Sequence, residues 1–104
     1  MAHYETLLLA RTEITKDEVE NLEKQFDQLL TDSKGKLNLF DKWGKYKLSY
    51  PVNKSIYGVY LFTRYELPKD NADSIFKEIN MLFKIKYNDI IKRFVTTKLE
   101  GTPS

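Results

Sequence analysis

The order in which the hydrophobic pattern changes along the chain is the feature that most constrains its fold. Four segments alternate apolar and polar residues with the period of a β-strand. Two others repeat apolar residues at i, i+3 and i+4, the period of an α-helix. In chain order these are strand 3–10, helix 16–34, strand 36–52, strand 59–67, helix 69–83 and strand 89–99. A chain of 104 residues with this pattern is long enough for a single domain, residues 1–104, around one core.

Local signals mark where these segments begin and end. Thr15 and Glu18 have the spacing of a capping box with Thr15 as the N-cap. At Trp43–Gly44 the alternation slips beside a glycine, which predicts a bulge in the second strand. We expect residues 53–57 to connect the second and third strands, and a short flexible tail to begin at about residue 100.

The element order predicts an α+β fold of the ferredoxin-like type, a βαββαβ sandwich. Its four-stranded antiparallel sheet carries both helices on one face, so the other face must meet water or a partner. Period-two alternation sends five apolar side chains to that uncovered face, where they form one patch. Because such a patch is an association surface, we expect a protein partner there. The predicted partner-face residues are Leu7, Leu9, Tyr60, Phe62 and Val95.

The residue types that enzymes and metal sites need are scarce. The chain has no cysteine, and its single histidine, His3, has no acidic or nucleophilic partner at a suggestive spacing. A glycine-rich phosphate loop is missing, and the carboxylates of the first helix are spaced as on a solvated face. No apolar run approaches the ~20 residues that span a bilayer. We therefore expect no enzyme activity, cofactor, metal, small-molecule substrate or membrane contact.

Charge is distributed unevenly, although the formal net charge is only +2. Residues 1–34 hold four Lys/Arg against eight Asp/Glu, whereas residues 35–104 hold thirteen against seven. A lysine on an edge strand can simply discourage aggregation. Two segments crowded with cations and aromatic rings instead favour RNA, since cations bind phosphates and rings stack on unpaired bases. The predicted RNA-binding cations are Lys42, Lys45, Lys47, Lys54, Lys84, Lys86, Lys92 and Arg93. The rings interleaved with them are Trp43, Tyr46, Tyr50 and Tyr87, of which we expect Tyr50 to belong to the core, as we do Tyr65.

Four stretches of the chain fall in the register of one protein family. They read HYE at 3–5, WGKYKLSYPVNK at 43–54, ELP at 66–68 and IIKRFVTTK at 90–98. With them the chain resembles the bacterial-type small-subunit ribosomal protein S6 family over residues 3–99. Many members have arginine at the position of His3, which implies an RNA contact there.

The resemblance implies the ferredoxin-like fold and a structural role in the small ribosomal subunit. It further implies that the chain binds the central domain of small-subunit ribosomal RNA together with ribosomal protein S18, as a heterodimer. The compartment would be the cytoplasm of a bacterium, with an organellar ribosome as the alternative.

A free RNA-binding module of the RRM type is the competing interpretation, because it shares the order of elements and stacks bases on sheet-face aromatics. The third strand of that module carries the pattern K/R-G-F/Y-G/A-F-V-x-F/Y. Residues 58–63 read GVYLFT, which lacks the leading cation and matches poorly. A small-molecule-binding or catalytic ferredoxin-like domain is a third interpretation, and the scarcity of candidate site residues counts against it. Co-sedimentation with small ribosomal subunits would separate the ribosomal interpretation from the other two.

Overall fold

The computed structural model describes residues 1–52 and 55–99, with side chains described for all of these except 45–52 and 55–56. Strands and helices follow the predicted order. The elements are β1 (Ala2–Ala10), α1 (Lys16–Asp32), β2 (Lys36–Val52), β3 (Ser55–Leu67), the 3-10 turn η1 (Lys69–Asn71), α2 (Ala72–Met81), the π-helical turn η2 (Leu82–Lys86) and β4 (Ile91–Leu99).

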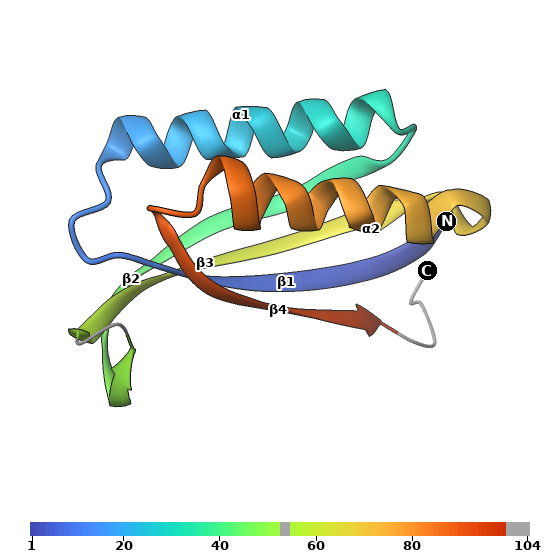
Figure 1. The fold of residues 1–104 in the computed structure, drawn as a ribbon. Helices are drawn as coiled ribbons and strands as arrows, with labels where there is room; N and C mark the ends of the chain where they lie inside the picture. Colours follow the sequence, from blue (N-terminus) through green and yellow to red (C-terminus); the bar gives the residue numbers. More distant parts are fainter. Residues whose placement is uncertain (53–54, 100–104) are drawn as a thin grey trace.

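The strands form one antiparallel sheet in the order β2-β3-β1-β4. Both helices lie on the same face of this sheet (Figure 1). β1 and β3 are the central strands, and β2 and β4 are the edges. The predicted ferredoxin-like α+β sandwich is confirmed.

Alternation along β1 decides which side chains reach the helices. Tyr4, Thr6 and Leu8 are buried in the core beneath α1 and α2, whereas Glu5 and Leu7 lie between them in sequence and face away. The rings of Phe26, Tyr65 and Phe83 form the centre of the core. Phe26 packs edge-on against Tyr65, with ring centroids 5.1 Å apart, and lies 5.3 Å from Phe83.

α1 begins at the capping box that the sequence predicts. Thr15 Oγ1 accepts a hydrogen bond from the Glu18 backbone N–H at 3.1 Å, and Glu18 Oε1 accepts one from the Thr15 N–H at 2.9 Å. At the other end Lys34 takes a left-handed φ of 64°, so the Gly35 N–H can donate to the Leu30 carbonyl at 2.7 Å. A side chain at Gly35 would clash with the backbone of β3, which explains the glycine.

The bulge in β2 is confirmed, whereas the predicted connection to β3 is partly wrong. The pairing of β2 with β3 shifts register between Lys42 and Gly44, and Gly44 has a φ of 100°, which favours glycine. β3 begins at Ser55 rather than after Gly58, and Ser55 already pairs with Val52. The composition of residues 53–57 is polar and typical of a turn, so it predicts a connection. The long strand β2 nevertheless provides a partner, and the ladder extends to Ser55.

The second helical segment and the last strand also differ from their predicted bounds. The expected helix 69–83 is divided into η1, α2 and η2. β4 begins at Ile91 instead of residue 89, because the Ile90 and Ile91 N–H groups both donate to the Tyr87 carbonyl in a tight turn. The π-helical bond from the Tyr87 N–H to the Leu82 carbonyl, 3.1 Å long, ends the helix.

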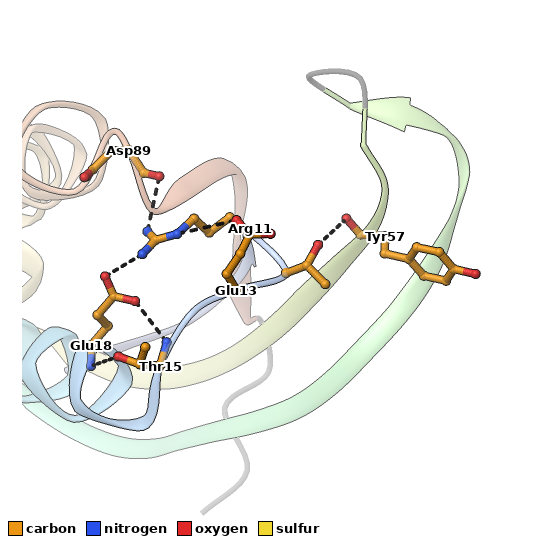
Figure 2. A network of polar contacts seen from close by, with 7 residues as sticks. Arg11, Glu13, Thr15, Glu18, Tyr57 and Asp89 are labelled. Carbon is orange, nitrogen blue, oxygen red and sulfur yellow. Dashed lines mark hydrogen bonds and ion pairs between the residues drawn. The ribbon is translucent and has the colours of Figure 1, made fainter.

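Polar contacts join two loops to α1 and β3 at one end of the sheet (Figure 2). Arg11 Nη2 donates to Glu18 Oε2 at 2.6 Å, and Arg11 Nη1 donates to the Asp89 carbonyl at 3.3 Å. Thr12 Oγ1 donates to the Tyr57 carbonyl at 3.3 Å. The network therefore ties the loop before α1 to the start of β3 and to the loop before β4.

Candidate nucleic-acid and protein interfaces

A basic groove runs between α2 and the edge strand β4. It has a volume of about 650 Å³ and is lined by Asn80, Lys84, Lys92, Arg93, Phe94 and Thr96, among others. Asn80 and Thr96 also line a second hollow of about 330 Å³, which extends toward Phe76 and Lys98. We call the two together the α2–β4 groove. Among the residues that the structure describes, none that lines the groove is acidic.

The groove exists because the sheet extends one strand beyond the helical layer. The helix-side positions of β1 are all buried, whereas on β4 Phe94 is half-buried and Thr96 and Lys98 are exposed. Thr96 is nevertheless held in place, because its Oγ1 lies 2.8 Å from Thr6 Oγ1. Thr6 Oγ1 in turn lies 2.8 Å from the Tyr65 hydroxyl. Burial raises the pKa of Tyr65, so this chain of hydroxyls stays neutral.

Three of the predicted RNA-binding cations meet at the groove. Lys84 comes from η2, and Lys92 and Arg93 come from the start of β4. Lys84 Nζ lies 5.9 Å from the centre of the Phe94 ring, which is cation–π distance. Lys86 is exposed nearby but donates to Gln25 Oε1 of α1 at 2.8 Å.

The remaining predicted RNA-binding residues are dispersed. Lys42 is exposed on β2, at the opposite edge of the sheet from β4. His3 pairs with Leu99 of β4 whereas Arg93 pairs with Leu9, so the two are about 20 Å apart along the strands. His3 Nε2 lies 3.8 Å from Glu66 Oε1. Lys54 lies outside the described residues, as do the side chains of Lys45 and Lys47.

The candidate stacking rings are mostly engaged within the chain. Tyr87 is buried, and burial raises its pKa. Its hydroxyl accepts a hydrogen bond from Asn21 Nδ2 at 3.1 Å. Because a buried ring cannot stack on a base, its predicted role in base stacking is wrong. Trp43 stacks on Phe62, with ring centroids 4.9 Å apart and planes 19° from parallel. The side chains of Tyr46 and Tyr50 lie outside the described part of the chain.

The face of the sheet away from the helices carries the predicted partner-face residues. The register places Leu7 between Phe62 of β3 and Val95 of β4, and Leu9 beside Tyr60. Val95 is 62% exposed, while Leu7, Tyr60 and Phe62 are half-buried.

Leu9 differs from the other four, because it is only 3% exposed and is already covered within the chain. It packs against Gly58, where a β-carbon would clash with the Leu9 side chain. Sequence reasoning missed that β2 widens the patch, since Leu39 and Trp43 are 39% and 46% exposed. We call Leu7, Leu39, Trp43, Tyr60, Phe62 and Val95 the apolar sheet face.

Charged residues flank the apolar sheet face along β1 and β3. Arg64 Nε donates to Glu5 Oε2 at 2.7 Å, and the Arg64 guanidinium carbon lies 5.4 Å from the centre of the Phe62 ring. Glu66 Oε2 accepts a hydrogen bond from Asn38 Nδ2 at 3.0 Å. The apolar side chains therefore have a polar rim, as the cores of protein interfaces do.

The described residues offer little for chemistry. No group of three or more His, Asp or Glu side chains in this part of the chain could hold a metal ion. Among the same residues, no helix combines the length and the apolar character that crossing a bilayer requires.

Comparison with known proteins matches the chain to one family. Residues 3–98 match the family model for ribosomal protein S6. Two curated relatives are named small ribosomal subunit protein bS6. The chain is 30% identical to the one from Rhodospirillum centenum over 100 residues, which cover 96% of this chain and 58% of that protein. It is 27% identical to the one from Moorella thermoacetica over the whole length of both chains.

A solved structure agrees with these matches at the level of the fold. The crystal structure of 30S ribosomal protein S6 from Thermotoga maritima superposes with a TM-score of 0.73, at 19% identity, covering 94% of this chain and 87% of that one. The relatives are ribosomal proteins, so the prediction that the chain is not an enzyme is confirmed. The chain belongs to the ribosomal protein S6 family, as its sequence motifs predicted.

Proposed function

We propose that the chain is a structural component of the small ribosomal subunit of a bacterium, where it binds small-subunit ribosomal RNA together with ribosomal protein S18. One observation carries this proposal: cations gather along one edge of the sheet, while exposed apolar side chains gather on the face without helices. Lys84, Lys92 and Arg93 gather at the β4 edge, while the apolar sheet face lies on the side without helices. Two surfaces of different chemistry fit two partners of different chemistry.

The β4 edge is the surface suited to RNA. Its cations project from the turn η2 and from the start of β4. Arg11 holds the loop before β4 near the start of α1, because it bonds both the Asp89 carbonyl and Glu18. The acidic side chains Glu20, Glu23 and Asp27 lie on α1, away from the β4 edge. Lysines act as point charges toward phosphate, so this surface would position RNA without reading its bases.

The apolar sheet face is the surface suited to ribosomal protein S18. Val95, Trp43 and Leu39 expose a large part of their side chains there. Phosphates gain nothing from such residues, whereas a protein interface core is built from them. Burying one more such side chain would contribute roughly 1.5–3 kcal/mol to association.

The RRM-type interpretation requires free aromatic rings on this same face. Phe62 is in the right position on β3, but Trp43 stacks on its ring and the Arg64 guanidinium lies over it. Bases would have to displace both neighbours before stacking. This arrangement favours the ribosomal assignment.

Co-sedimentation with small ribosomal subunits at moderate salt tests the proposal. Subunits that lack their S6 protein, supplied with ribosomal protein S18, should take up the chain in a one-to-one ratio. Uptake should fall when ribosomal protein S18 is withheld. If the chain stays in the supernatant but binds free single-stranded RNA, the RRM-type interpretation is correct instead.

A further inference from the structure

We propose that the α2–β4 groove recognises the ribose 2′-hydroxyl of RNA through Thr96 and Asn80, and so distinguishes RNA from DNA. The inference rests on the proposed function, which assigns the cations of this edge to RNA phosphates. It goes further, because phosphates are common to both nucleic acids and cannot produce a preference for ribose. The 2′-hydroxyl can produce one, since only RNA carries it.

Neutral hydrogen-bonding groups alternate with cations along the groove. Lys92, Thr96 and Lys98 of β4 all line it. In an extended strand Thr96 lies about 13 Å beyond Lys92 and about 7 Å before Lys98. Across the groove, Asn80 of α2 is exposed and lines both hollows. Because a nucleic-acid backbone alternates phosphates with sugars, this order of side chains suits it.

A chain of hydrogen bonds fixes the position of the Thr96 hydroxyl. Tyr65 is fully buried, and its hydroxyl lies 2.8 Å from Thr6 Oγ1, which lies 2.8 Å from Thr96 Oγ1. A buried O–H without an acceptor is costly, so Tyr65 donates to Thr6, and Thr6 donates to Thr96. Thr96 therefore accepts within the chain and keeps its own hydrogen for a group in the groove. A donor that is already held in place favours recognition of one acceptor, because little side-chain freedom is lost on binding.

The acceptor that fits this donor is a sugar oxygen. Thr96 lies between Lys92 and Lys98 along β4, so an RNA strand whose phosphates contact both lysines passes over the Thr96 hydroxyl. In duplex RNA the 2′-hydroxyls lie in a wide, shallow minor groove that side chains can reach. The amide of Asn80 is both a donor and an acceptor, which matches a hydroxyl that is itself both. Among the described residues no carboxylate lines the groove, so none repels the phosphates on either side of the sugar.

The test compares three duplexes of about 12 base pairs and identical sequence, bound to the full-length chain at low salt and measured by fluorescence anisotropy. One is RNA and one is DNA. The third is RNA with fluorine in place of every 2′-hydroxyl, which keeps the A-form but cannot donate and accepts poorly. We expect RNA to bind about three- to tenfold more tightly than the fluorinated duplex, as the net loss of one hydrogen bond predicts. DNA should bind no more tightly than the fluorinated duplex.

Variants of two neighbouring threonines assign the preference to one hydroxyl. Thr96→Val removes the hydroxyl but keeps the shape of the side chain, so it should lower affinity for RNA about three- to tenfold and leave affinity for the fluorinated duplex within about twofold. Thr97→Val is the matched control, since Thr97 is exposed and pairs with Glu5, which faces away from the helices. It should leave both affinities unchanged. Thr96→Ser keeps the hydroxyl and should keep the preference for RNA, whereas Asn80→Leu should reduce it.

Three outcomes would overturn the inference. Equal affinity for the RNA and the fluorinated duplex would leave only phosphate contacts in the groove. A Thr96→Val variant that weakens binding of both duplexes equally would make Thr96 a structural residue. A change of base sequence that alters affinity more than removal of the 2′-hydroxyls would show that the groove reads bases. In each case the chain still binds RNA and the proposed function stands, whereas failure to bind any of the duplexes would contradict both proposals.

Discussion

Replacing Phe62 with aspartate should separate association from folding on the apolar sheet face. The Trp43–Phe62 stack contributes about 0.5–1.5 kcal/mol to folding, and the Arg64–Phe62 contact about 0.5–1 kcal/mol. A carboxylate at this position would also lie opposite Asp41 of β2, at a cost of about 0.2–1 kcal/mol. The sum of roughly 1–3.5 kcal/mol is smaller than the 5–15 kcal/mol that typically stabilises a domain.

Association should suffer more than folding. Losing the buried ring costs about 1.5–3 kcal/mol, which alone weakens binding tenfold or more. A carboxylate forced into an apolar interface adds a desolvation penalty of several kcal/mol. We therefore expect Phe62→Asp to remain folded but to lose measurable binding to ribosomal protein S18.

Urea denaturation and a pull-down with ribosomal protein S18, both on the same preparation, measure the two effects. Ser74→Asp is the matched control, because it adds the same charge at an exposed position on α2. Phe62→Ala removes the ring without the repulsion from Asp41 and should also remain folded. If Phe62→Asp is folded and still binds, the partner docks elsewhere. If Phe62→Ala unfolds, the stack is part of the core, and the assignment of this face to a partner is wrong.

Three further predictions concern charge and the buried hydroxyls. Lys92→Ala/Arg93→Ala should weaken RNA binding and reduce the slope of log affinity against log salt by roughly 0.9 per lost phosphate contact on a duplex; an unchanged slope would make both residues structural. Thr15→Ala should lower the free energy of unfolding in urea by about 1 kcal/mol through loss of the helix cap. In the folded chain the Thr15 N–H, together with Arg11, lowers the pKa of Glu18, so the separate contribution of the ionised Glu18 carboxylate is present above the ordinary carboxyl value of 4.5 and is lost as pH falls from there through the lowered pKa. Burial raises the pKa of Tyr65, so the folded chain loses stability as pH rises above the ordinary value of 10.0, and Tyr65→Phe should remove that loss in an alkaline denaturation series.

Local and periodic signals in the sequence were sufficient for the fold. The capping box at Thr15, the glycine at the Trp43–Gly44 bulge and the change of period between segments are each visible within a few residues of sequence. Together they determined the element order and which face of each strand is buried. The family motifs, which lie along almost the whole chain, determined the family.

Element boundaries were less predictable where the geometry of a turn decides them. β3 starts early because Ser55 pairs with Val52, and β4 starts late because the Tyr87 carbonyl accepts from both Ile90 and Ile91. Neither the strand pairing nor the turn has a signature in the local composition.

Only the tertiary structure decided which candidate site residues act together. Counting cations along the chain could not show that Lys84 and Arg93 meet at one groove while His3 lies at the far end of β1. Nor could alternation show that Leu9 is already covered or that Tyr87 is buried against α1. Periodicity assigns a side chain to a face, but exposure depends on what the remaining elements leave uncovered. Here the helical layer covers β1 and leaves the helix side of β4 open, because the sheet is one strand wider than the helices above it.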